Sequence, residues 1–173
     1  MIFRIDDINA NSDIEKIVEM EEMILSRFPR AGIINCITIL SGESDNGSAY
    51  QEIKPWDADL PKAGKMFNLE WTKLLKGEIA SHGLWHIQHG KAGKELQEYS
   101  IRTSCEILET RYFCPPFIDI NKDTVDICLK SGITIIGTEK KWINIERNEI
   151  GSNDMLLFHP WKMSIEELKN KLK

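Results

Sequence analysis

Residues 2–7 read Ile-Phe-Arg-Ile-Asp-Asp, a short apolar segment that ends in two adjacent acids. Its β-branched and aromatic residues predict a strand over residues 2–5. Apolar residues at helical spacing over residues 12–28 predict a helix directly afterwards, with Ser12 and Glu15 as its capping box. The chain therefore opens with a strand–helix unit, which is typical of α/β folds.

The rest of the chain repeats this alternation of strands and helices. Further strands are predicted at residues 33–40, 77–80, 111–114, 133–136, 142–145 and 155–158. Further helices are predicted at residues 66–76, 91–109 and 121–131, and at the C-terminus after a capping box of Ser164 and Glu167. The order predicts a mostly parallel sheet with covering helices, in one domain over residues 1–173.

Composition narrows the functional classes. Lysine and arginine number 22 against 27 acids, which gives a formal charge of −5 and argues against a nucleic-acid binder, which would show a basic stripe. The sequence has no apolar run of the ~20 residues that a membrane span needs. The N-terminal residues do not resemble a secretory signal, and the four cysteines fit neither a zinc motif nor a CxxC motif. We therefore expect a cytoplasmic protein with reduced, mostly core-packed cysteines.

Candidate functional residues follow the predicted strands. Parallel sheets place their chemistry at the carboxyl ends of the strands. Asp6 and Asp7 end the first strand, His82 follows the third, and His159 follows the strand at 155–158. The pattern predicts that these side chains share one edge of the sheet.

Three of the four histidines cluster at positions 82, 86 and 89. On a helical turn, His82 and His86 would face the same way and could share a cation, although two surface histidines give the same spacing. Adjacent acids point in different directions, so one of Asp6 and Asp7 could ligate a metal while the other acts as a base. For His89 we expect an exposed position in a turn.

Four segments together resemble the motifs of the polysaccharide deacetylase (NodB-homology) family of metal-dependent carbohydrate esterases. Residues 3–7, Phe-Arg-Ile-Asp-Asp, are similar to its Thr-Phe-Asp-Asp motif. Residues 81–86, Ser-His-Gly-Leu-Trp-His, resemble its His-Ser/Thr-x-x-His motif. Residues 111–117, Arg-Tyr-Phe-Cys-Pro-Pro-Phe, are similar to Arg-Phe-x-Arg-Pro-Pro-Tyr, and residues 156–159, Leu-Leu-Phe-His, to Leu-x-x-His. The segments occur in the order of the family and span nearly the whole chain.

The resemblance implies a distorted, incomplete (β/α) barrel that acts on an acetylated sugar or glycan intermediate, with N-acetyl favoured over O-acetyl. It implies a divalent metal, zinc by default with cobalt, nickel or iron as options, held by Asp7, His82 and His86. Asp6 would then be the general base and His159 the general acid. The backbone N–H of Phe117 would stabilise the oxyanion.

Some positions depart from the family pattern. Ile8 replaces the usual glycine, Cys114 replaces the arginine that holds the base, and the Asp-x-x-Asp-Trp motif is not evident. Arg4, two residues before Asp6, could face the same way along the strand and replace the missing arginine.

The expected substrate-contacting residues at the same edge are Arg4, Trp56, Trp85, Pro116 and Trp161. The indole rings of the three tryptophans could stack on sugar rings, and ordinary packing within loops is an equally good explanation of these residues. The long segment at 41–65, which carries Trp56, is expected to select the substrate.

Two other functions remain open. The departures from the family pattern would also suit a catalytically silent relative that binds carbohydrate or a partner protein. Two histidines and a carboxylate are also the ligands of non-haem iron oxygenases, but those sites usually occur on all-β folds, by fold-level analogy. The oligomeric state is not predicted.

Overall fold

Strand β1 (Ile2–Ile8) lies inside one parallel sheet. The computed structural model describes residues 1–41, 65–137, 142–144 and 155–173. Within these residues, the sheet has the strand order β7-β6-β5-β2-β1-β9-β8, and every neighbouring pair is parallel. The other strands of this sheet are β2 (Gly32–Ile37), β5 (Glu78–Ser81), β6 (Tyr112–Phe113), β7 (Thr134–Ile135), β8 (Trp142–Asn144) and β9 (Met155–Phe158). The predicted parallel sheet is confirmed, and its curled, open form is the incomplete barrel that the motifs implied.

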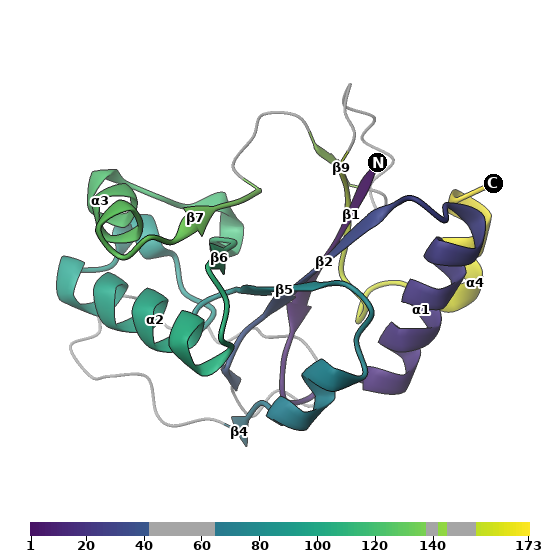
Figure 1. The fold of residues 1–173 in the computed structure, drawn as a ribbon, viewed down its shortest axis with the longest axis horizontal. Coiled ribbons are helices and arrows are strands. Elements are labelled where there is room, and N and C mark those ends of the chain that lie inside the picture. The colour runs from purple at the N-terminus through teal and green to yellow at the C-terminus, as the bar shows by residue number, and fades with distance from the viewer. Residues whose placement is uncertain (42–64, 138–141, 145–154) are drawn as a thin grey trace.

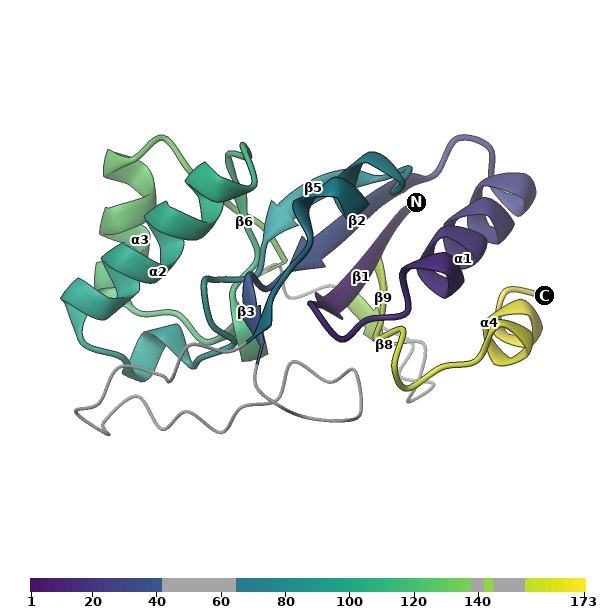
Figure 2. The ribbon, with the colours of Figure 1, turned by 90° about the horizontal axis from the view of Figure 1, so that it is seen from below.

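Helices cover the outer face of the sheet at its two ends. Figures 1 and 2 show α1 (Ile14–Arg27) and α4 (Ile165–Lys171) together at one end, and α2 (Lys94–Ile107) and α3 (Lys122–Lys130) together at the other. A separate antiparallel pair joins β3 (Leu40–Ser41) to β4 (Lys65–Met66). No helix among the described residues is long and apolar enough to cross a membrane.

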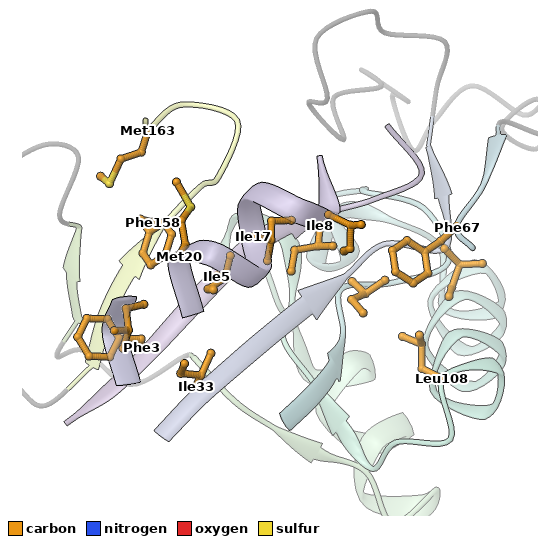
Figure 3. Close-up of a cluster of buried hydrophobic side chains, with 14 of the residues drawn as sticks. Phe3, Ile5, Ile8, Ile17, Met20, Ile33, Phe67, Leu108, Phe158 and Met163 are labelled. Atoms are coloured by element: carbon orange, nitrogen blue, oxygen red, sulfur yellow. The ribbon is translucent and has the colours of Figure 1, made fainter. Parts of the chain in front are cut away.

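The core below α1 explains why β1 is central. Phe3 and Ile5 are fully buried and pack with Ile17 and Met20 of α1 and with Phe158 of β9, as Figure 3 shows. Each fully buried side chain of this size stabilises the fold by about 1.5–3 kcal/mol. Because side chains alternate along a strand, the residues between Phe3 and Ile5 and after Ile5 face the interior of the barrel.

The N-terminal caps of α1 and α4 can be compared with the predicted capping boxes. The capping box of Ser164 and Glu167 is present at α4. At α1 the N-cap is Asp13, whose side chain accepts from the backbone N–H of Lys16, so the prediction of Ser12 was wrong by one residue. Ser12 instead accepts a hydrogen bond from the backbone N–H three residues earlier and closes the preceding turn.

The helix predicted at residues 66–76 is wrong in extent. Only a short 3-10 helix, η1 (Leu69–Lys73), forms there, since Lys65 and Met66 pair with β3. η1 buries none of its residues fully, so the segment lacks the buried apolar stripe that stabilises a longer helix.

Candidate functional site

Asp7 occupies a strained position near the end of β1. The pairing of β1 with β2 shifts register between Ile5 and Ile8, and the backbone of Asp7 adopts a left-handed φ of 61°. That conformation costs a residue with a side chain about 1–2 kcal/mol. Asn9 Nδ2 donates a hydrogen bond to the Asp7 carbonyl at 2.8 Å and holds the turn. The irregularity turns the two adjacent acids toward different partners.

Asp7 lies between two histidines. Its Oδ1 is 2.9 Å from His86 Nε2 and 3.3 Å from His82 Nε2, and all three residues are buried. Donor atoms from the three side chains lie within 4.8 Å of one another. Although burial alone would raise it, the pKa of the Asp7 carboxyl is held well below its usual range by its hydrogen bonds with the two imidazoles. Asp7, His82 and His86 therefore place a buried carboxylate anion beside two imidazole rings whose nitrogen atoms could ligate a metal.

The histidine pair does not lie on a helical turn as predicted. His82 follows β5 directly, and the chain then runs without helix to His86. Gly83 has a φ of 94°, a conformation that favours glycine, and its N–H donates to Ser81 Oγ at 3.0 Å. The two rings nevertheless converge, with centroids 5.0 Å apart. The residues between them are held by hydrogen bonds from Ile39 N to the Gly83 carbonyl and from Leu40 N to the Leu84 carbonyl.

A hydrogen bond to the chain after β6 orients the His82 ring. Its Nδ1 donates to the carbonyl oxygen of Cys114 at 2.7 Å, which leaves Nε2 facing Asp7. This contact is of the kind that fixes the tautomer and the orientation of metal-binding histidines. Burial lowers the pKa of His82, but the hydrogen bond with Asp7 and further contacts raise it to about 10; burial lowers the pKa of His86.

His89 is fully buried, so the expectation of an exposed turn residue is wrong. Its Nε2 is hydrogen-bonded to Ser100 Oγ at 3.1 Å, and the same hydroxyl accepts the backbone N–H of Leu84 at 3.0 Å. Burial lowers the pKa of His89 to about 3, so it is neutral. Sequence reasoning missed Ser100, whose one signal was a polar residue on the inner face of a predicted helix.

Asp6 pairs with Arg4. Arg4 Nη2 lies 2.8 Å from Asp6 Oδ2, and the two side chains are only 2% and 6% exposed. Arg4 Nη1 also donates to the carbonyl of Gly137 at 3.2 Å. Asp6 Oδ1 is buried and has no hydrogen-bond partner among the described residues. The ion pair agrees with the prediction that Arg4 is a partner of Asp6. Because the Arg4 side chain is buried, it does not reach a position from which it could contact a sugar directly.

Gly137 is a second residue that sequence reasoning missed. Its backbone has a φ of 77°, and a Cβ there would overlap Arg4 Nη1. It follows the strand predicted at residues 133–136, and a glycine directly after a strand was the available signal. The position has to stay free of a side chain for Arg4 to reach both of its partners.

His159 and Trp161 approach Asp7 from the other side. His159 Nε2 is 3.7 Å from Asp7 Oδ2, and Trp161 Nε1 donates to the same oxygen at 3.2 Å. The His159 side chain is 17% exposed, more than the 3% of His82 and His86. This is therefore the more open side of the site.

The remaining predicted contact residues divide into exposed and buried positions. Phe117 is 45% exposed, has a φ of 57° and sets its ring 4.7 Å from that of His86, whereas Pro116 is buried. Trp85 is 5% exposed within the core, so the stacking role predicted for it has no accessible ring face. Trp56 lies outside the described residues.

Comparisons with known proteins agree with this architecture. No protein-family model and no curated protein matches the chain. A solved CE4 family pseudoenzyme from Bacillus anthracis has a TM-score of 0.64 at 13% identity, over 99% of this chain and 60% of its own. A family 4 carbohydrate esterase from Streptomyces lividans, in complex with acetate, has a TM-score of 0.58 at 12% identity, over 98% of this chain and 82% of its own.

The chitin deacetylase from the fungus Colletotrichum lindemuthianum has a TM-score of 0.58 at 12% identity, over 99% of this chain and 80% of its own. The chain thus spans about three-fifths of the length of the pseudoenzyme, and more of the two enzymes. At these identities the likeness establishes the fold. The chain has the fold of the CE4 family polysaccharide deacetylases, which confirms the fold implied by its four sequence motifs.

Proposed function

We propose that the protein is a metal-dependent hydrolase that removes an acetyl group from a sugar or glycan, with N-acetyl expected over O-acetyl. One observation carries the proposal: a buried carboxylate between two histidines, Asp7 with His82 and His86, is followed back along the strand by a second buried carboxylate, Asp6, which pairs with Arg4. The shared fold with a chitin deacetylase and a family 4 carbohydrate esterase supports the substrate class.

The three side chains fit a divalent cation. One carboxylate and two imidazoles are a common zinc ligand set that leaves positions open for water and substrate. The same ligands also suit cobalt, nickel or iron. When bound, such a cation would supply Lewis acidity that lowers the pKa of water and polarises the acetyl carbonyl. Asp7, His82 and His86 would hold it.

Asp6 is proposed as the general base. Its Oδ2 is occupied by Arg4, while Oδ1 has no hydrogen-bond partner among the described residues and so can take a proton from the attacking water. Arg4 acts as a positioning residue: it holds the carboxylate in one orientation and balances its charge in a buried setting. Arg4 thereby takes the role of the family's arginine, whose position is occupied by Cys114 in this chain.

His159 and Phe117 complete the proposed reaction. His159, on the more open side, would donate a proton to the departing amine or alkoxide. The backbone N–H of Phe117 would stabilise the oxyanion of the tetrahedral intermediate. The exposed ring of Phe117 and the half-buried ring of Trp161 are proposed to contact the sugar, beside Pro116.

The proposal is tested by acetate release. Metal-free protein is loaded with Zn²⁺ or Co²⁺ and incubated with N-acetylated chitooligosaccharides and O-acetylated xylan, and released acetate is measured. We expect turnover that Asp6→Asn and His159→Gln each reduce by about 10²–10⁴-fold, while Asp126→Asn on α3 leaves it unchanged.

A silent carbohydrate-binding protein would behave differently. The metal-loaded protein would release no acetate from either substrate, and Asp6→Asn would bind the sugar as tightly as the unchanged chain. That result would overturn the hydrolase and support the alternative that the Cys114 departure raised.

A further inference from the structure

A second group of metal-ligating side chains lies behind the Asp7 centre. Cys36 of β2, Cys114 after β6 and His82 are all buried, and one donor atom from each lies within 4.8 Å of the others. We propose that Cys36, Cys114 and His82 form a second cation site, selective for a thiophilic ion such as Cd²⁺ or Zn²⁺.

The sheet brings the two thiols together. β5 lies between β2 and β6, and Cys36 is in register with Ala80 of β5. Cys114 directly follows Phe113, the residue of β6 that pairs with β5. Cys36, Ala80 and Cys114 form one buried cluster. The thiols are thus neighbours through strand pairing, although the chain separates them widely.

The donor set matches a thiophilic ion. Two thiolates and one imidazole form a tetrahedral zinc or cadmium set with one open position, with Zn–S near ~2.3 Å and Zn–N near ~2.0 Å. Donor atoms in such a tetrahedron are ~3.5–3.8 Å apart, so atoms already within 4.8 Å need only small movements.

The charges also balance. Binding releases one proton from each thiol to solvent and requires the Nδ1 proton of His82 to leave that nitrogen, to solvent or to Nε2, and the two resulting thiolates neutralise a divalent cation. The nearby Arg4 guanidinium stabilises both thiolates electrostatically, and its own charge is balanced by Asp6.

His82 links this site to the Asp7 centre. Its Nε2 faces Asp7, its Nδ1 donates to the Cys114 carbonyl, and one of its ring nitrogens lies within 4.8 Å of the two sulfur atoms. An ion held by the thiols would take Nδ1 and break the hydrogen bond that orients the ring. Occupancy of the thiol site should therefore weaken metal binding at Asp7. Only this consequence for activity rests on the proposed function, whereas ion binding by the thiols does not.

The test is a Cd²⁺ titration of the reduced, metal-free protein, followed by thiolate-to-cadmium charge-transfer absorption in the ultraviolet. We expect the absorption to saturate at one equivalent of thiolate-bound ion. It should be lost in the double variant Cys36→Ser with Cys114→Ser. It should persist in the matched control Cys105→Ser with Cys128→Ser, since these cysteines are also buried but lie in another cluster.

The variant Asp7→Asn separates the two sites. It should lose binding at the Asp7 centre and keep the thiolate absorption, so failure of the proposed hydrolase and failure of the thiol site give different results. Absence of the absorption from the unchanged protein, or its loss in the control double variant, would overturn the proposal.

A second measurement needs no substitution. In ¹¹³Cd NMR, a cadmium ion with two sulfur ligands resonates far downfield of one with only nitrogen and oxygen ligands. The unchanged protein should show a sulfur-shifted resonance. A spectrum with nitrogen- and oxygen-ligated cadmium alone would refute the thiol site even if the double variant does not fold.

Discussion

The Arg4–Asp6 pair depends on the absence of a side chain at Gly137, so Gly137→Ala should break it. The added Cβ would overlap Arg4 Nη1 and would lie 3.2 Å from Cys114 Sγ. Arg4 would lose the Gly137 carbonyl and would move away from the Asp6 carboxylate. Both charges would then be buried without their present partners.

The size of the effect has two parts. An alanine at the left-handed φ of 77° costs about 1–2 kcal/mol in backbone strain. Breaking a buried ion pair costs about 3–5 kcal/mol, because the remaining charge is left uncompensated. The sum, about 4–7 kcal/mol, is a large part of the ~5–15 kcal/mol that stabilises an ordinary domain.

Gly132→Ala is the matched control, because Gly132 also has a positive φ, of 66°, but a Cβ there meets nothing within 4 Å. Urea unfolding of both variants and of the unchanged chain gives the comparison. Gly132→Ala should lose only the backbone part, about 1–2 kcal/mol. Equal losses in the two variants would show that Gly137 does not serve Arg4, and the proposed positioning of Asp6 would fall with it.

Other predictions concern the histidine loop and the metal. Ser100→Ala removes the hydroxyl that the Leu84 N–H and His89 share. It should lower the free energy of unfolding by about 1–3 kcal/mol, measured in urea, and weaken Zn²⁺ binding, measured by calorimetry. An unchanged Zn²⁺ affinity would show that this hydroxyl does not support the metal site. His89, with a pKa lowered by burial from 6.5 to about 3, is neutral when folded, so the unfolded chain takes up its proton first as pH falls below 6.5. The metal-free protein should thus lose about 2 kcal/mol from this group by pH 5, and His89→Gln should flatten that part of the pH–stability curve; parallel curves would contradict the assignment. Zn²⁺ at 100 times its dissociation constant for the Asp7 centre should stabilise the protein by about 2.7 kcal/mol, seen as a rise in Tm. In a chain that carries Cys36→Ser and Cys114→Ser, so that the thiols bind no ion, Asp7→Asn should abolish this rise; a rise that survives would place the ion elsewhere.

Local sequence patterns accounted for much of the fold. The short apolar segment of β1, the β-branched run of β2 and the capping box of α4 depend on neighbours within a few residues, so they could be predicted directly. The alternation of strands and helices also predicted that Asp7, His82 and His159 would meet, since carboxyl ends of parallel strands share one edge of a sheet. The structure places these side chains together.

Contacts between distant segments could not be predicted in this way. The histidine loop is not helical, and Trp85 and His89 are buried, because the end of the sheet, the Ser100 hydroxyl and the packing around β6 determine their positions. Helical spacing of the two histidines is a local signal and does not include these partners.

The sequence by itself determined the order of the chemical groups along the chain: two acids near the end of β1, histidines after β5 and β9, and a double proline after β6. Only the tertiary structure decided how they are held. Arg4 reaches Gly137, 133 residues away, and Cys36 meets Cys114 across an intervening strand. The physical reason is that such contacts depend on which strands become neighbours and on the free volume at small residues, and neither leaves a periodic trace in the sequence.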